Sequence, residues 1–264
     1  MYRGMALETK LQLAGLLGGA ALAPFTALGS YLRRSRLFHP CGICVRAVAQ
    51  SVPDADGYHE AGARLAGPVL VRFSGAWWKS HQWPDVLGCA LRFTADESFG
   101  LAPHASDQDL LLATIRNPLT TLLAAASTHV DDYMSNAYFG VSPFRVAPNG
   151  RVKLRLRALQ RTPGAPTRDK RLLQALACGP LAMVLEARPD RFGARYRALA
   201  RIELLEPIGL DQRALRFDPF ATGRGFVPTG LVHALRAASY PASRHARDAA
   251  ARRAMRRTPL SGLS

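Results

Sequence analysis

The sequence predicts an α+β fold, in which about eight short strands form an antiparallel β-barrel or sandwich with flanking helices. Short runs rich in β-forming residues recur along the chain, and several of them alternate apolar and polar side chains, as half-buried strands do. The run "VKLRLRAL" (152–159) is the clearest case, because Val152, Leu154 and Leu156 share one side and basic residues stand between them. The turn signal "PNGR" precedes it, which indicates a hairpin.

Taken in chain order, the strand-like runs are separated by turn residues or by short helical patterns. The predicted strands are 42–50, 67–75, 88–95, 109–115, 138–147, 152–159, 180–188 and 196–206. The predicted helices are 117–136, 170–178 and a last helix that starts near Gly230 and runs past Arg247 into a basic tail. An apolar content of 48% with 20% charged residues is typical of a globular chain.

The chain is strongly basic, with a net charge of +16, yet only four of its 35 basic residues are lysines. Such a bias toward arginine can reflect base composition, so the charge alone does not indicate a nucleic-acid partner. It does raise the affinity of the surface for anionic lipid, nucleic acid or acidic ligands in general. Basic patches interleaved with aromatic residues, which bind single strands by stacking, are lacking, so we expect no specific nucleic-acid partner.

The four cysteines are too few for a disulfide scaffold in a chain of this length. Cys41 and Cys44 form the CxxC pattern "CGIC", which could be half of a zinc site or a redox pair. No second CxxC and no downstream histidine pair supplies the other ligands. We therefore predict that these two residues are ordinary buried thiols.

Residues 11–32 carry no charge and are long enough to span a bilayer, although glycines and Pro24 dilute their apolar strength. They form either a membrane-associated segment or an alanine-rich arm that packs on a partner. The "RRSR" that follows would hold the C-terminal side in the cytoplasm. We predict an N-terminal arm or membrane-associated segment at 1–33, a main domain at 34–247 and a basic tail at 248–264. The expected location is cytoplasmic, with residues 11–32 as the means of any inner-membrane association.

The last predicted helix carries an unusual stripe, because Arg236, Tyr240, Ser243 and Arg247 stand at spacings that share one helix face. An arginine one turn before a tyrosine can hydrogen-bond the phenol oxygen and favour the phenolate. A phenolate suits ferric iron, and tyrosine is an established haem ligand. Arg247 could then pair with a haem propionate. The stripe on its own is also compatible with a surface helix.

Four further segments carry a resemblance to the haem catalase superfamily. They are "FHPCGICVR", "VRFS", "GCALRF" and the closing segment "LRFDPFATGRGFVPTGLVHALRAASYPASRHAR". Their order and spacing across about 34–247 are similar to those of the family, whereas the long wrapping and C-terminal portions of full-length catalases are absent. The chain thus resembles a short, catalase-like protein. The resemblance implies a catalase-like antiparallel barrel with a C-terminal haem-ligand helix, and haem b as cofactor.

The resemblance also implies roles for individual residues. Tyr240 would be the proximal ligand of the haem iron, with Arg236 as its partner and Ser243 facing the macrocycle. His39 would be the distal histidine, which moves a proton between the two oxygens of a bound peroxide. Ser74 would orient His39 through its other ring nitrogen. The haem propionates would be bound by Arg36, Arg72 and Arg247.

The chain departs from the family pattern on the distal side. Where catalases carry a distal asparagine on the fourth strand, this sequence reads "ASDQDLLLA", which puts Gln108 or Asp109 at that position. Asp109, the third residue we assign to catalysis, would be anionic beside the peroxide unless it is buried and protonated. Cys41 stands where the family usually has lysine.

These departures lead to two functional hypotheses. In the first, the protein is a haem enzyme acting on peroxides, more as a peroxidase or a converter of organic and lipid hydroperoxides than as a fast H2O2 disproportionating catalase. In the second, it is a non-catalytic catalase-like barrel that binds lipid or a protein partner at a membrane. The expected partners are a peroxide or lipid hydroperoxide substrate, a membrane surface and further copies of the chain.

Overall fold

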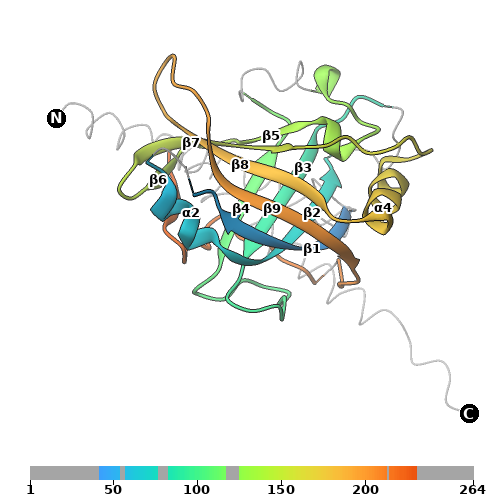
Figure 1. Cartoon of the computed structure of the whole chain (residues 1–264), viewed down its shortest axis with the longest axis horizontal. Helices are drawn as coiled ribbons and strands as arrows, with labels where there is room; N and C mark the ends of the chain where they lie inside the picture. The colour runs from blue at the N-terminus through green and yellow to red at the C-terminus, as the bar shows by residue number, and fades with distance from the viewer. Residues whose placement is uncertain (1–41, 54–56, 77–82, 117–124, 213, 231–264) are drawn as a thin grey trace, which may run out of the picture. The chain divides into compact units, whose positions relative to one another are not determined.

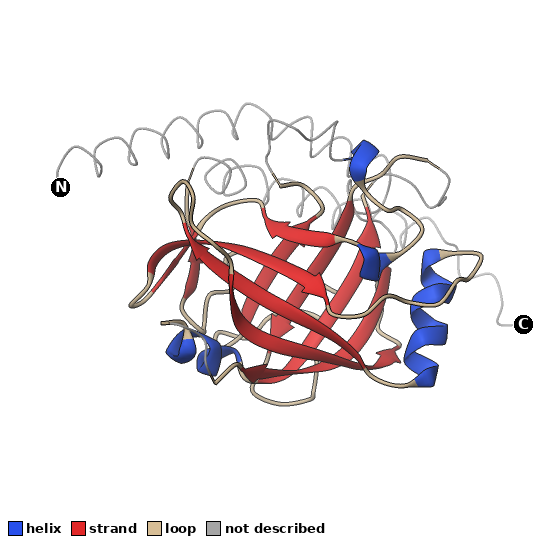
Figure 2. Ribbon diagram, turned by 45° about the horizontal axis from the view of Figure 1, so that its top comes forward, coloured by secondary structure: helices blue, strands red, loops and turns tan. Residues whose placement is uncertain are grey.

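The computed structural model describes residues 42–53, 57–76, 83–116, 125–212 and 214–230. The described residues 42–228 lie in one compact unit. Its centre is a strongly curved antiparallel sheet, and the closed ring of strands is visible in Figures 1 and 2.

Eight strands close the barrel in the order β7-β5-β4-β3-β2-β1-β9-β8, and the β7–β8 pairing completes the ring. Every neighbouring pair in it is antiparallel. The predicted antiparallel barrel of about eight strands is therefore confirmed. The strands of the ring are β1 (Gly42–Ser51), β2 (Gly67–Gly75), β3 (Leu87–Phe93), β4 (Gln108–Ala113), β5 (Ala137–Gly140), β7 (Gly150–Ala158), β8 (Leu181–Pro189) and β9 (Arg197–Ile208).

Two short strands extend the sheet beyond the ring. The predicted single strand 138–147 is wrong, because the chain turns at 141–143 and continues as β6 (Phe144–Val146), which pairs with β7. Strand β10 (Phe226–Pro228), which the sequence patterns did not reveal, pairs with β6. A strand this short has too few residues for a periodic signal.

The pleat of the strands separates two apolar clusters. Odd-numbered residues of β1, β2 and β3, such as Val45, Val71 and Leu91, lie in the main core inside the barrel, and Leu154 and Leu156 of β7 join them. Even-numbered residues of the same three strands point outward. Among them Cys44 and Leu70 belong to a second, smaller cluster. The predicted alternation in "VKLRLRAL" is confirmed.

The helices agree only in part with the predicted ones. Helix α4 (Arg168–Cys178) confirms the predicted 170–178 helix, and the Thr167 side chain caps it by accepting a hydrogen bond from the Lys170 backbone nitrogen. The helix predicted at 117–136 is wrong for 128–136, which form turns and a 3₁₀ turn at Tyr133–Ser135. Asp132 and Asn136 bind backbone groups there with their side chains, and such bonds compete with a continuous helix.

Several predictions fall on residues outside the described ranges. These are the boundaries of the N-terminal segment and the C-terminal tail, the apolar segment 11–32 and the helix that begins near Gly230. Within the described ranges, no helix combines the length and the apolar character that crossing a membrane requires.

Helix α2 (His59–Leu65), which was not predicted, packs closely against β9 at Gly62. A Cβ atom placed on Gly62 would lie 2.2 Å from the Leu199 carbonyl oxygen and 3.0 Å from Ser51 Oγ. The helix can approach the barrel wall this closely only because position 62 lacks a side chain.

We predict that Gly62→Ala lowers the free energy of unfolding by about 1–3 kcal/mol, because the strand carbonyl cannot move out of the way. The clash would outweigh the better helix propensity of alanine. Gly209→Ala is the matched control, since a Cβ there meets nothing within 4 Å. Urea denaturation of the two variants measures the difference, and equal stabilities would contradict the close packing of α2.

Candidate functional site

The outer face of strands β1 to β4 is covered by the segment that follows β9. Leu215 and Phe217 of this segment form the second apolar cluster together with the outward residues Cys44 and Leu70. Buried polar side chains lie on the same outer face of these strands, namely Arg72, Ser74, Arg92 and Asp109. A buried polar set under a covering segment is a candidate for function, because burying such groups costs free energy unless they are well paired.

The predicted site residues Arg72 and Ser74 both point outward from β2 and are both 3% exposed. Arg72 Nε donates a hydrogen bond of 2.8 Å to Gln212 Oε1 in the covering segment. The Gln212 amide in turn donates to Cys44 Sγ at 3.0 Å. These contacts tie β1, β2 and the covering segment together.

The start of β1 is shaped by Arg72. A Cβ on Gly42 would lie 3.0 Å from the Arg72 guanidinium and 2.4 Å from the Phe73 carbonyl oxygen, so the glycine of "CGIC" makes room for the arginine. Gly42 is also the register partner of Ser74. The end of β2 that carries the predicted serine therefore adjoins the point where β1 begins, three residues after His39.

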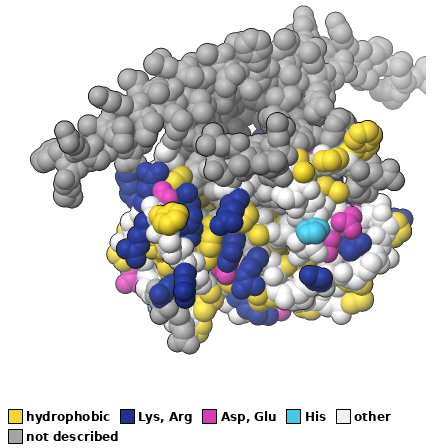
Figure 3. Space-filling model, turned by 90° about the horizontal axis from the view of Figure 1, so that it is seen from above, with side chains coloured by type: hydrophobic (Ala, Val, Ile, Leu, Met, Phe, Trp, Pro, Cys, Tyr) yellow, Lys and Arg dark blue, Asp and Glu magenta, His cyan; other side chains and the backbone are white. Residues whose placement is uncertain are grey.

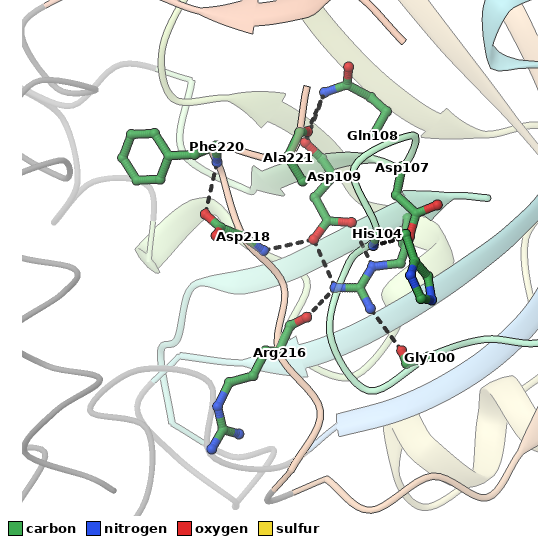
Figure 4. Close-up of polar contacts among 10 residues, drawn as sticks. Gly100, His104, Asp107, Gln108, Asp109, Arg216, Asp218, Phe220 and Ala221 are labelled. Carbon is green, nitrogen blue, oxygen red and sulfur yellow. Dashed lines mark hydrogen bonds and ion pairs between the residues drawn. The ribbon is translucent and has the colours of Figure 1, made fainter. Parts of the chain in front are cut away.

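Arg92 and Asp109 form a fully buried ion pair between the adjacent strands β3 and β4, where they are register partners. Arg92 Nε lies 2.8 Å from Asp109 Oδ1, and Arg92 Nη2 lies 2.9 Å from Asp109 Oδ2. This two-point contact is the strongest geometry for an arginine and a carboxylate. Figure 4 shows the network around it.

The ion pair also holds the backbone of the covering segment. Arg92 donates to the carbonyl oxygens of Gly100 (2.9 Å) and Arg216, and Asp109 Oδ2 accepts from the Asp218 backbone nitrogen at 2.7 Å. The Arg92 guanidinium carbon stands 4.8 Å from the centre of the Phe217 ring, a cation–π contact. The "FDPF" segment is thus anchored to the barrel by one arginine and one aspartate.

Burial raises the pKa of the Asp109 carboxyl above its ordinary value, and the hydrogen bonds and positive charge of Arg92, together with the Asp218 amide, offset part of this rise. Both carboxyl oxygens accept hydrogen bonds from the chain itself. The predicted catalytic role of Asp109 stays a prediction, and its contacts are those of a residue that positions the covering segment.

Gln108, the other residue at the expected place of a distal amide, is also engaged. Its Nε2 donates to the carbonyl oxygens of Ala221 (3.0 Å) and Phe226 (3.1 Å), and its Oε1 accepts from the Phe226 backbone nitrogen at 3.0 Å. The side chain is fully buried. Its amide nitrogen and its amide oxygen both bond the backbone of Phe226, and these two bonds join β4 to β10.

The other six predicted site residues lie outside the described residues. They are Arg36, His39, Arg236, Tyr240, Ser243 and Arg247. Within the part of the chain that the structure describes, no cluster of three or more histidine, cysteine or acidic side chains could hold a metal ion. Cys44 is buried, as predicted, whereas Cys41 lies outside the described residues.

Sequence reasoning missed two residues of this face, Arg92 and Gln212. Arg92 carried no clear signal, because an arginine at an outward strand position normally meets solvent, and here the distant covering segment buries it. Gln212 lies in a connecting segment with no periodicity, so nothing in the sequence distinguished it.

The comparisons with known proteins bear on the fold. No family model matches the chain, and no curated protein matches its sequence. Among solved structures, a fungal catalase is 12% identical, with a TM-score of 0.52, and the match covers 83% of this chain and 61% of that one. The fold is catalase-like.

The second solved structure, catalase A from Saccharomyces cerevisiae, is 12% identical with a TM-score of 0.48, over 83% of this chain and 62% of that one. The catalase-like chain thus spans about three fifths of the length of the fungal catalase. At this identity the likeness shows the fold, and function has to be argued from the residues.

We predict that Asp109→Asn lowers the free energy of unfolding by about 3–5 kcal/mol, because it leaves the Arg92 guanidinium charged and buried without its carboxylate. Asp96→Asn removes one carboxylate from an exposed turn and is the matched control. Chemical denaturation measures both.

A double variant, Arg92→Met with Asp109→Leu, tests the reason for the loss. Removing both charges should restore part of the stability that Asp109→Asn loses, since no buried charge stays unpaired. The single variants Arg92→Met and Asp109→Leu complete the cycle. If the double variant loses as much stability as these two singles added together, the ion pair is not the source of the effect.

Proposed function

We propose that the protein is a haem-dependent oxidoreductase that acts on peroxides, preferring peroxidase chemistry or organic hydroperoxides to fast H2O2 disproportionation. The observation that carries the proposal is the placement of Arg72 and Ser74, both buried and both on the outward face of β2 in a catalase-like barrel. These are the two residues of the "VRFS" strand to which the resemblance assigns haem-site roles.

The described residues fit haem in their chemistry. A guanidinium such as that of Arg72 binds a carboxylate through two parallel hydrogen bonds, so it would hold a propionate. Its rigid placement against Gly42 and Gln212 fixes the direction of its donors. Tyr240 would supply the phenolate ligand, helped by Arg236, and Arg36 and Arg247 would hold propionates. When bound, haem would supply the redox-active iron at which the O–O bond is broken.

The proton would be handled by residues of the chain. His39 would take a proton from one peroxide oxygen and give it to the other, which makes the departing oxygen a better leaving group. Ser74 would accept a hydrogen bond from the other ring nitrogen of His39 and fix its tautomer and orientation. This role of Ser74 is supported by its register pairing with Gly42, which begins the strand that follows His39 in the sequence.

The preference for hydroperoxides over fast H2O2 turnover rests on β4. The hydrogen bonds of Gln108 and Asp109 go to the chain's own backbone and to Arg92. Neither side chain therefore resembles a distal amide whose hydrogen bonds are directed to a bound peroxide. In peroxidase turnover, a hydroperoxide is reduced to an alcohol and water by two electrons and two protons, and an organic reductant supplies the electrons. A rearrangement of the hydroperoxide would need no reductant.

We predict that the purified protein, produced with ample haem, shows a stoichiometric haem absorption band that is lost or shifted in Tyr240→Phe. Removing the phenol oxygen removes the iron ligand. Tyr196→Phe is the matched control, because this tyrosine directly precedes β9 and contacts Arg155 and Arg188 instead of the proposed haem residues. A wild-type protein without a haem band would overturn the enzyme hypothesis and favour a non-catalytic barrel.

We further predict that Ser74→Ala keeps haem but slows the reaction with cumene hydroperoxide by about 10- to 100-fold, the effect typical of losing the group that orients a functional histidine. The pH at which the rate is half-maximal should shift as well, since the hydroxyl no longer fixes the imidazole. Ser98→Ala, in the exposed turn at 96–98, is the control. Unchanged rate and pH profile would remove Ser74 from the mechanism.

A further inference from the structure

One side of the barrel, away from the covering segment, carries a dense array of cations. We call it the basic face, and it consists of outward side chains of β6, β7 and β8 and of the turn between β8 and β9. Its members are Arg145, Arg151, Lys153, Arg155, Arg157, Arg188, Arg191 and Arg195. Figure 3 shows lysine and arginine side chains gathered on the described surface with hydrophobic ones among them.

Two carboxylates lie beneath these cations. Glu186 lies 2.6 Å from Arg155 Nε and 3.1 Å from Arg157 Nε, and Asp190 lies 2.7 Å from Arg151 Nε and 3.3 Å from Lys153 Nζ. The Glu186 side chain is 8% exposed, whereas that of Arg157 is 46% exposed. Each carboxylate is therefore shared by two cations and is less exposed than they are. The groups that solvent reaches on this face are mainly cationic.

The strand register places like charges opposite one another. Arg145 pairs with Arg151 across β6 and β7, and Lys153 pairs with Arg188 across β7 and β8. Like charges directly opposite each other destabilise a sheet. Asp190 offsets part of this repulsion, and the eight cations of the face still outnumber its two carboxylates, so the face suits an anionic partner.

The turn between β8 and β9 adds an apolar tip. Phe192 is fully exposed, and Arg191 and Arg195 stand on either side of it in the sequence. Gly193, with φ +74°, lets the chain turn directly after Phe192. Figure 1 shows this β8–β9 connection extending from the barrel wall. The Tyr196 ring, four residues after Phe192, contacts the guanidinium groups of Arg155 and Arg188, whose carbons lie 4.2 and 5.3 Å from its centre.

We propose that the basic face and the Phe192 turn dock the protein on an anionic lipid bilayer. The arginines and Lys153 would bind lipid phosphates and carboxylates, and Phe192 would enter the boundary between headgroups and acyl chains. The proposal goes beyond peroxide chemistry and does not depend on haem.

The tip favours lipid over nucleic acid as the partner. Proteins that bind single strands stack successive bases on aromatic side chains along a groove. The basic face instead has one exposed aromatic residue on a projecting turn, and its other aromatic ring, Tyr196, is already in contact with two guanidinium groups.

The test is co-sedimentation of the full-length protein with phosphatidylcholine vesicles, with and without 30% phosphatidylserine. We expect the wild type to bind the anionic vesicles, and 0.5 M salt to weaken the binding by screening. Arg191→Glu with Arg195→Glu should reduce the partition coefficient by about tenfold or more, and Phe192→Ser by several-fold. Arg161→Glu with Lys170→Glu changes the net charge equally outside the face and should bind like the wild type.

Binding of both face variants at wild-type strength would overturn the proposal, because attachment would then come from another part of the chain, such as residues 11–32. It would also be overturned if the variants lose retention on DNA but keep vesicle binding. Haem content, measured on the same samples, should be equal in all of them. A failure of docking is thereby distinguished from a failure of the proposed function.

Discussion

The two-point contact between Arg92 and Asp109 is the constraint on which the outer face of the barrel depends. It joins β3 to β4 and fixes the backbone at Arg216 and Asp218 of the covering segment. An ion pair this deeply buried stabilises only when its remaining donors and acceptors are used, and here the backbone carbonyls and the Asp218 amide use them. Strand β10 follows this anchored segment in the chain, so the pair helps to set where β10 meets β6.

The pleat of the strands separates the apolar core from the polar side chains of the barrel wall. Inward residues build one apolar core, in which the aromatic rings of Phe73, Tyr133 and Tyr138 pack together. Outward residues of β2, β3 and β4 instead carry the buried polar groups, and those of β7 carry the exposed cations. One scaffold can therefore present a protected polar site on one side and a charged surface on another, without disturbing the core between them.

The candidate site was predicted from sequence to different extents at different residues. Arg72 and Ser74 alternate with apolar residues in "VRFS", so their shared outward face follows from strand periodicity. Asp109 was identified by its position, but its partner Arg92 could not be paired with it, because cross-strand register depends on the turns and loops between strands. Gln108 and Gln212 owe their roles to contacts across more than a hundred residues, which leave no local pattern.

The sequence by itself determined most of the antiparallel strands and their inward and outward faces, because periodicity and turn residues act locally. Its motifs, taken together, carried the resemblance to catalases. The tertiary structure decided the closure of the ring through β7 and β8, the anchoring of "FDPF" by Arg92 and the layering of Glu186 and Asp190 beneath the basic face. Each of these results from pairing between distant segments, whose free energy depends on burial and register and not on neighbours along the chain.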